Sequence, residues 1–344
     1  MVAASAVVSA PLLEPAPEGL GCARGGFHVD PWGAAATAVV THVHGDHLVP
    51  GSARYVCAAP SLPFLRKRLG PEVAAEGVPY GARFRLGDVT VSFHPSGHVR
   101  GAAQVRLEAG GEVWVVSGDY KRAPDPTCAP FEVVPCDVFI TEATFALPLY
   151  RWRDPQAVVA EILAWWDGNR AAGVASVLFA YAMGKAPRIL AELALLTDPA
   201  RAVLVHGAVE GLVELYREAG VRLLPTSKVS DTARGRSFAG ELVLAPPAAS
   251  GSTWMRRFGP HETAFASGWM RVRGTRRRKG FDRGFALSDH ADWPALLRTI
   301  EETGARRVLV THGYADELSR YLRERGYDSA ALPTPFRGEA DLES

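Results

Sequence analysis

The sequence has few cysteines, and they are scattered. Cys22, Cys57, Cys128 and Cys136 form no CxxC pair. This spacing argues against a zinc knuckle and against the disulfide framework of a small secreted domain. A chain of 344 residues is also long enough to bury a core without crosslinks. We therefore expect a protein of the reducing cytoplasm.

The sequence also lacks a long apolar run and a net excess of charge. No apolar run approaches the roughly 18 to 20 residues that span a bilayer, so we expect no membrane association. The N-terminal MVAASAVVSAP is apolar but has no basic leader, which favours a tail or a first strand over a secretory signal. The chain has 38 Lys and Arg against 37 Asp and Glu, so the whole molecule is neither a polycation nor a polyanion.

The charge is nevertheless unevenly distributed. The stretch 271–284, RVRGTRRRKGFDRG, holds seven Lys or Arg residues and one Asp. Such a run is usually a solvated surface, and it can also bind a polyanion. Which of the two applies depends on what lies beside it.

The pattern of the chain changes near residue 150. Short runs typical of strands dominate the first 145 residues, at 89–94, 102–107, 112–119 and 136–143. From Asp154 onward, helical and strand patterns alternate, as in a parallel α/β sheet. After the basic run come a capped helix, DWPALLRTIEETG, and a buried strand, RRVLVTHG. This order predicts an α/β domain inserted between two parts of another domain.

The stretch THVHGDH, residues 41–47, directly follows the apolar run 34–40. Side chains alternate along an extended strand, so His42 and His44 are predicted to lie on one side and to bind one ion. Gly45 then permits a turn, after which Asp46 and His47 can face a second ion. Imidazoles with a carboxylate suit Zn²⁺ best and Mn²⁺ or Fe less well. The alternative is a histidine-rich surface turn.

Further candidate ligands lie at the ends of later strand patterns. They are His98 in PSGH, Asp119 in SGD, Glu142 in ITEA, His290 in SDH and His312 in THG. Each alone is more often a satisfied polar residue than a ligand. Their common position at strand ends favours a second metal and its associated catalytic groups.

These motifs, in this order, resemble the metallo-β-lactamase-fold nucleases of the beta-CASP group, which act on DNA or RNA. The resemblance covers nearly the whole chain. Three longer stretches, GDYKRAPDPTCAPFEVVPCDVFITEATFALPLYRW, YAMGKAPR and GFALSDHADW, are similar to the bacterial ligase-associated DNA exonucleases. One departure is Pro187, where this family is expected to have glutamine.

The resemblance implies a metallo-β-lactamase αββα sandwich, formed by residues 1–150 and 285–344, with an α/β beta-CASP domain inserted at 151–284. It also implies two divalent ions, Zn²⁺ or Mn²⁺. One would be held by His42, His44, His98 and Asp119. The other would be held by Asp46, His47, His312 and the shared Asp119.

The predicted chemistry is hydrolysis of a phosphodiester by a hydroxide that bridges two ions. Asp46, Asp119, Glu142 and His290 are the predicted catalytic residues. His290 would give a proton to the leaving oxygen or bind the scissile phosphate, and Glu142 would orient that imidazole. Metal-bound histidines usually donate their second N–H to a carboxylate, and Asp30 is the predicted acceptor.

For nucleic-acid binding, two sets of basic residues are candidates. Lys185 begins a helix after a strand, where backbone N–H groups could also receive a phosphate. The basic run immediately precedes His290 and so must approach the site. Its predicted DNA contacts are Arg271, Arg273, Arg276, Arg277 and Arg278.

We therefore predict a metal-dependent DNA exonuclease. The resemblance implies a 5′ polarity, single-stranded or frayed ends as substrate, and a repair role beside an ATP-dependent DNA ligase and a helicase. The first alternative is an RNA-processing nuclease, since the predicted metal site does not distinguish the two polymers. A small-molecule hydrolase of the same fold and a scaffold without activity are the others.

Overall fold

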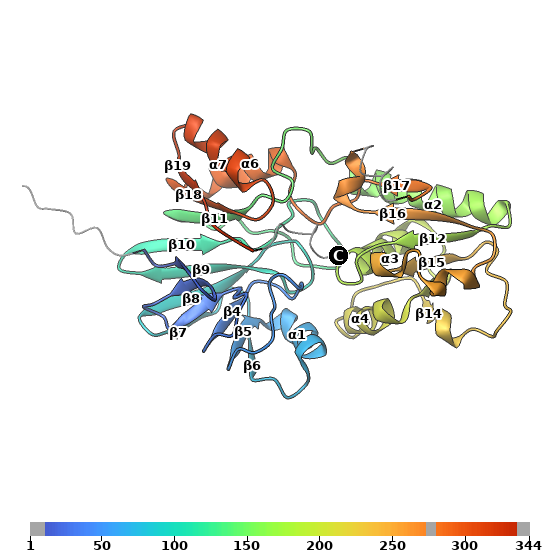
Figure 1. Cartoon of the computed structure of the whole chain (residues 1–344), viewed down its shortest axis with the longest axis horizontal. Coiled ribbons are helices and arrows are strands. Elements are labelled where there is room, and N and C mark those ends of the chain that lie inside the picture. The colour runs from blue at the N-terminus through green and yellow to red at the C-terminus, as the bar shows by residue number, and fades with distance from the viewer. Residues whose placement is uncertain (1–10, 273–279, 336–344) are drawn as a thin grey trace, which may run out of the picture.

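The computed structural model describes residues 11–272 and 280–335, and the strands in these ranges form three sheets (Figure 1). The first sheet consists of β1 (Glu14–Ala16), β2 (Gly19–Cys22), β3 (Phe27–Val29), β4 (Ala38–Val40), β5 (Tyr55–Ala58) and β6 (Ala75–Val78), in chain order. From β3 to β6 neighbouring strands run parallel.

The second sheet combines strands from the two ends of the chain. Its members are β7 (Arg83–Leu86), β8 (Val89–Pro95), β9 (Ala103–Ala109), β10 (Glu112–Val116), β11 (Val138–Glu142), β18 (Arg307–Thr311) and β19 (Asp328–Ala331). β18 pairs in parallel with β11, so that Glu142 lies opposite Thr311. This pairing brings the end of β11 beside His312.

These two sheets face each other across an apolar core. Val29 and Val56 of the first sheet belong to the same buried cluster as Val91 and Trp114 of the second. Helix α1 (Leu62–Leu69) packs on the outer face of the first sheet, and α6 (Trp293–Thr303) and α7 (Ala315–Glu324) pack on the outer face of the second. The result is a helix, sheet, sheet, helix layering (Figure 1).

The third sheet lies in a separate lobe and is entirely parallel among the described strands. Its order is β14 (Thr226–Lys228), β13 (Val203–Val205), β15 (Leu242–Ala245), β12 (Ala175–Phe179), β16 (His261–Ala266) and β17 (Arg283–Phe285). One face is covered by α2 (Pro155–Ala171), α3 (Lys185–Leu196) and α4 (Gly207–Glu218). The other face is covered mainly by short 3-10 turns and loops.

Local sequence explains where the main helices begin and end. The Asp154 side chain accepts hydrogen bonds from the first backbone N–H groups of α2, with Pro155 at the first position. Asp292 caps α6 in the same way, and Gly304 ends it in the left-handed conformation at φ +69°. These signals are local, so the predicted helices are found where expected.

The prediction of an α/β chain is confirmed, and the four strand patterns named for the first part correspond to β8, β9, β10 and β11. The predicted boundaries at 150/151 and 284/285 stay a prediction, and β17 crosses the second of them. All four cysteines are free. Within the described ranges, no helix combines the length and apolarity that a membrane crossing requires.

Candidate metal centre

The candidate site lies where several strands end at one edge of the two facing sheets. THVHGDH leaves the end of β4, Asp119 follows β10, Glu142 ends β11 and His312 follows β18. The loops approach so closely that a Cβ on Gly118 would lie 2.7 Å from the Thr41 Cβ, and its φ is +54°. A glycine in the SGD motif therefore lets Asp119 enter the site.

A first group of possible ligands consists of His42, His44, His98 and Asp119. The Nδ1 atom of His44 lies 3.2 Å from His42 Nε2 and 3.1 Å from His98 Nε2. His42 Nε2 is also 3.4 Å from the Asp119 carboxylate. Four potential ligand atoms thus converge from the residues that the resemblance implied, and three imidazoles with a carboxylate suit a divalent ion such as Zn²⁺.

A second group consists of Asp46, His47 and His312. The rings of His47 and His312 stack with their centroids 5.0 Å apart. Nε2 of both rings and Oδ1 of Asp46 are buried, and none of these three atoms has a hydrogen-bond partner in the described structure. Buried polar atoms without partners are costly. A cation between them would satisfy all three, so the residues fit a metal ion.

Asp119 lies between the two groups. Its Oδ2 faces His42 Nε2 at 3.4 Å, and its Oδ1 faces His47 Nε2 at 3.5 Å. One carboxylate therefore offers an oxygen to each group. This is the arrangement expected of a ligand shared by two ions.

Burial and neighbouring charges adjust the protonation of these residues. Burial lowers the pKa of His312 to about 4, with repulsion from His47 adding to the effect. Burial and His290 hold the pKa of His98 well below its usual value. Burial raises the pKa of Asp119, but the neighbouring His47 and His290 outweigh it and hold that pKa well below its usual range. At neutral pH His98 and His312 are thus neutral and Asp119 is anionic, as metal ligands must be.

His47 differs from the other two histidines. Burial lowers its pKa, yet the carboxylates of Asp119, Asp46 and Asp30 prevail and hold the pKa well above the usual value. The same three carboxylates that favour a proton on His47 would also favour a cation bound beside them.

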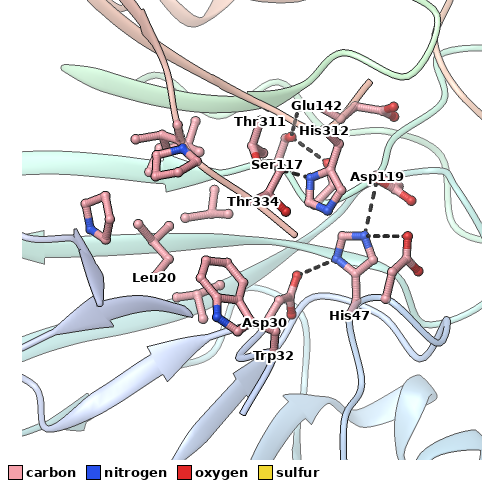
Figure 2. A pocket seen from close by; sticks show the side chains of 18 residues that line it. Leu20, Asp30, Trp32, His47, Ser117, Asp119, Glu142, Thr311, His312 and Thr334 are labelled. Carbon is pink, nitrogen blue, oxygen red and sulfur yellow. Dashed lines mark hydrogen bonds and ion pairs between the residues drawn. The ribbon is translucent and has the colours of Figure 1, made fainter. Parts of the chain in front are cut away.

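Asp30 orients His47 (Figure 2). Its Oδ2 accepts the Nδ1 proton of His47 at 2.7 Å and the hydroxyl proton of Thr41 at 2.5 Å. Its Oδ1 accepts from the Thr41 backbone N–H at 2.7 Å. The contact expected of Asp30 with a histidine of the site is present, and it directs His47 Nε2 toward Asp46 and Asp119.

Backbone strain is also found at this site. Among the described residues, Asp30 and His312 are the non-glycine residues with positive φ, at 43° and 60°. This region of backbone space is unfavourable for side chains with a Cβ and is often found at functional sites. His312 is a member of the second group, and Asp30 binds His47 of that group.

Glu142 and His290 form a buried pair beside the two groups. Nδ1 of His290 donates to the Glu142 carboxylate, 2.8 Å from Oε2 and 3.0 Å from Oε1. The backbone N–H of Tyr120 donates to the same carboxylate at 2.8 Å. Together with Asp119 the two residues offer ligand or proton-transfer atoms within 4.8 Å of one another. The predicted orienting contact of Glu142 with His290 is present.

The second group lines one end of a hollow between the two facing sheets. Figure 2 shows His47, His312 and Asp119 at one side of this hollow and Leu20 and Trp32 at another. The remaining walls are largely apolar. The site is therefore polar at the metal groups and apolar beside them, as ligand pockets commonly are.

The structure gives no support to a phosphate contact by Lys185, which the sequence suggested. The side chain is completely buried, and its ammonium lies 2.8 Å from the Asp289 carboxylate. An ion pair closed to solvent does not offer a charge to a polyanion. Of the basic run, Arg271 is exposed at the end of the 3-10 turn Gly268–Arg271. The other predicted contacts, Arg273, Arg276, Arg277 and Arg278, lie outside the described residues.

Two contributors to the site were not found by sequence reasoning. Thr41 anchors Asp30 through both its N–H and its hydroxyl. Asp289 accepts the Nδ1 proton of His98 with its backbone carbonyl at 2.8 Å. The role of Thr41 could have been predicted, since Thr41 is the first residue of THVHGDH. The role of Asp289 could not, because its backbone carbonyl makes the contact with His98, 191 residues away, and a backbone contact does not depend on residue type.

Comparison with known proteins gives a sequence relative and a solved structure of similar fold. No family model matches the chain. A protein named "Probable DNA ligase" from Opitutus terrae (strain DSM 11246 / JCM 15787 / PB90-1) is 32% identical over 295 residues, which is 85% of this chain and 28% of the relative. This chain thus spans little more than a quarter of that protein.

A solved structure is similar at the level of the fold. It is described as the crystal structure of a protein of unknown function from Enterococcus faecalis V583. The TM-score is 0.56 at 13% identity, over 88% of this chain and 80% of that one. At this identity the likeness concerns the arrangement of helices and strands alone.

Proposed function

We propose that this protein is a metal-dependent DNA exonuclease that hydrolyses phosphodiester bonds with two divalent ions, Zn²⁺ or Mn²⁺. The observation that carries the proposal is Asp119, which offers one carboxylate oxygen to each of two adjacent ligand groups. Two divalent ions held by these groups would activate water and neutralise the charge of a phosphodiester.

The chain's own residues supply the rest of the chemistry. Glu142 accepts the Nδ1 proton of His290 and stabilises the imidazolium that forms when Nε2 is protonated. Such an imidazolium can bind a phosphate oxygen or donate a proton to the leaving oxygen. Asp46 and Asp119 are anionic ligands that would hold the cations at the site. Asp30 keeps His47 in the orientation and tautomer of a ligand.

The layered arrangement supports assignment to the metallo-β-lactamase fold with an inserted beta-CASP domain. Under this proposal residues 1–150 and 285–344 form the sandwich and 151–284 the insertion. DNA as the substrate is supported by the name of the Opitutus relative, although this chain matches 28% of its length. The 5′ polarity, the action on single-stranded or frayed ends, the association with a ligase and a helicase, and the cytoplasmic location stay predictions.

The test uses DNA and RNA strands labelled separately at the 5′ and 3′ ends, incubated with the purified protein and Mn²⁺ or Zn²⁺. Progressive shortening of DNA from the 5′ end is expected. Asp119→Ala is expected to abolish cleavage and keep DNA binding. Cleavage of RNA alone would overturn the choice of substrate in favour of an RNA-processing nuclease. Undiminished cleavage by Asp119→Ala would overturn the site.

A further inference from the structure

Six charged side chains are buried together between the sandwich and the third-sheet lobe. We call them the buried ion cluster: Lys121, Asp125, Lys185, Arg188, Glu192 and Asp289. None of these side chains is more than 5% exposed. They come from the loop after β10, from α3 and from the loop between β17 and α6. The cluster therefore joins three segments that are far apart in the chain.

Asp289 is the centre of the buried ion cluster. Its Oδ2 lies 2.8 Å from Lys185 Nζ, and its Oδ1 accepts from Arg188 Nη1 at 3.0 Å. Arg188 Nη1 also donates to the backbone carbonyl of Ser288 at 2.8 Å. Lys121 Nζ adds a longer contact with Asp289 at 3.7 Å. Cations from two lobes thus fix both the side chain of Asp289 and the peptide before it.

The backbone of this segment contacts the metal centre directly. The carbonyl of Asp289 accepts the Nδ1 proton of His98 at 2.8 Å. With that proton on Nδ1, the lone pair of Nε2 faces His44 and Asp119, which it approaches to 3.1 and 3.8 Å. The next residue in the chain is His290. Small movements of residues 288–290 would therefore turn two imidazoles of the site.

Stability alone does not explain this arrangement. Taking charges out of water is expensive, and apolar side chains of similar volume are often at least as stabilising. What a buried ionic contact does provide is a defined geometry. Arg188, with its planar fork, grips the Ser288 carbonyl and the Asp289 carboxylate together.

We propose that Lys185 and Arg188 of the third-sheet lobe, through Asp289, are positioning residues that set the orientation of the His98 imidazole for metal binding. The inference rests on the proposed function, because it takes the group of His42, His44, His98 and Asp119 to be a metal site. In this arrangement the third-sheet lobe holds a ligand of the sandwich in place. The lobe thus has a part in the metal centre that is separate from any contact with nucleic acid.

The test is a titration of the metal-stripped full-length protein with Zn²⁺ in competition with a chromophoric chelator. His42→Ala and His312→Ala serve to identify the first and the second group. Lys185→Met is expected to weaken Zn²⁺ binding at the first group by about 10- to 100-fold, the range known for residues that orient metal ligands. Binding at the second group should stay within error of wild type.

Two further variants keep the test decisive if Lys185→Met folds poorly. The double variant Lys185→Met/Asp289→Asn removes one charge of each sign. It should also weaken Zn²⁺ binding at the first group and leave the second group unchanged. Arg188→Lys keeps the charge but not the fork on the Ser288 carbonyl, and a smaller selective loss is expected. The matched control is Leu190→Ala, because Leu190 is fully buried on α3 in the apolar core of the third sheet. It should lower the melting temperature without changing Zn²⁺ affinity.

The outcomes separate the two proposals. If the wild type binds no Zn²⁺, the proposed function fails and the positioning role falls with it. If the wild type binds Zn²⁺ and the three cluster variants bind it equally well, the positioning role alone is wrong. The positioning role is also wrong if Leu190→Ala weakens Zn²⁺ binding as much as Lys185→Met does. The loss of affinity would then result from a general loosening of α3.

Discussion

The carboxylate of Asp30 and the imidazole of His47 lie 2.7 Å apart and form the link that connects β3 to the candidate metal centre. Asp30 adopts a φ of 43°, an unfavourable value for a residue with a Cβ. Thr41 holds the same carboxylate from the other side. These contacts stabilise the strained backbone of Asp30, and together they fix the orientation of the His47 ring.

This relationship gives a first prediction. Asp30→Asn should weaken metal binding at the group of Asp46, His47 and His312 by about 10- to 100-fold, because His47 loses the acceptor that orients its ring. A Zn²⁺ titration measures the change. Asp137→Asn is the matched control, since Asp137 also accepts from a backbone N–H, that of Val113, away from the site. Equal affinities in Asp30→Asn and wild type would contradict the role.

A second prediction concerns metal content. His42→Ala and His312→Ala should each reduce the bound metal from two equivalents to about one. Asp119→Ala should weaken metal binding at both groups, because Asp119 offers an oxygen to each. Dialysis against excess Zn²⁺ followed by elemental analysis measures the stoichiometry. A wild type that retains a single ion under these conditions would rule out the two-metal arrangement.

A third prediction separates the Glu142 and His290 pair from the metal ligands. Glu142→Gln should lower kcat for DNA hydrolysis by about 10²- to 10⁴-fold, because the imidazolium of His290 loses its stabilising carboxylate. Metal content should not change. Glu132→Gln is the control, since Glu132 makes a comparable contact of 3.0 Å with His94 at an exposed position. A loss of metal in Glu142→Gln would make Glu142 a ligand instead.

A fourth prediction is the pH dependence of stability at Asp125. Burial raises the pKa of this carboxyl, but Lys121 and Arg188 outweigh it and hold the pKa below the usual value, with Asp289 and Glu192 as the neighbouring acids. The ionised form therefore stabilises the fold above the unfolded-state pKa of about 3.9, and this contribution is lost as the pH falls through the lowered folded-state pKa.

Asp125→Asn should accordingly cost about 3 to 5 kcal/mol at neutral pH, the range for breaking a buried ion pair. The difference from wild type should shrink below about pH 4. Urea unfolding between pH 3 and pH 8 measures it. The control is Asp231→Asn, because Asp231 pairs with Lys228 in solvent. A difference that is constant over this pH range would show that Asp125 is not ionised in the fold.

Much of the fold could be predicted because its signals are local. Apolar strands, the Asp154 and Asp292 caps and the glycine after α6 identify elements without knowledge of their neighbours. The change of pattern near residue 150 likewise anticipated the separate parallel sheet. The exact bounds of the domains stay a prediction, since β17 belongs by pairing to the third sheet and by sequence to the segment before His290.

For the site, residue type and spacing were sufficient to select the candidates. THVHGDH and the later strand-end acids and histidines are rare combinations, and the structure brings all of them to one edge of the sandwich. The burial of Lys185 could not be predicted, because a lysine at a helix start looks the same in sequence whether it faces solvent or a buried acid. Its partner Asp289 is 104 residues later, so only the packing of the lobes reveals the pair.

The sequence by itself thus determined which side chains are candidate ligands, because ligand type and strand-end position are properties of short segments. The tertiary structure decided how these side chains are distributed between the two groups of possible ligands. It placed Asp119 between two groups, held His47 with Asp30, and joined His98 to the third-sheet lobe through Asp289. These relationships depend on distances between segments far apart in the chain, and burial then favours them, since a polar atom taken out of water without a partner is costly.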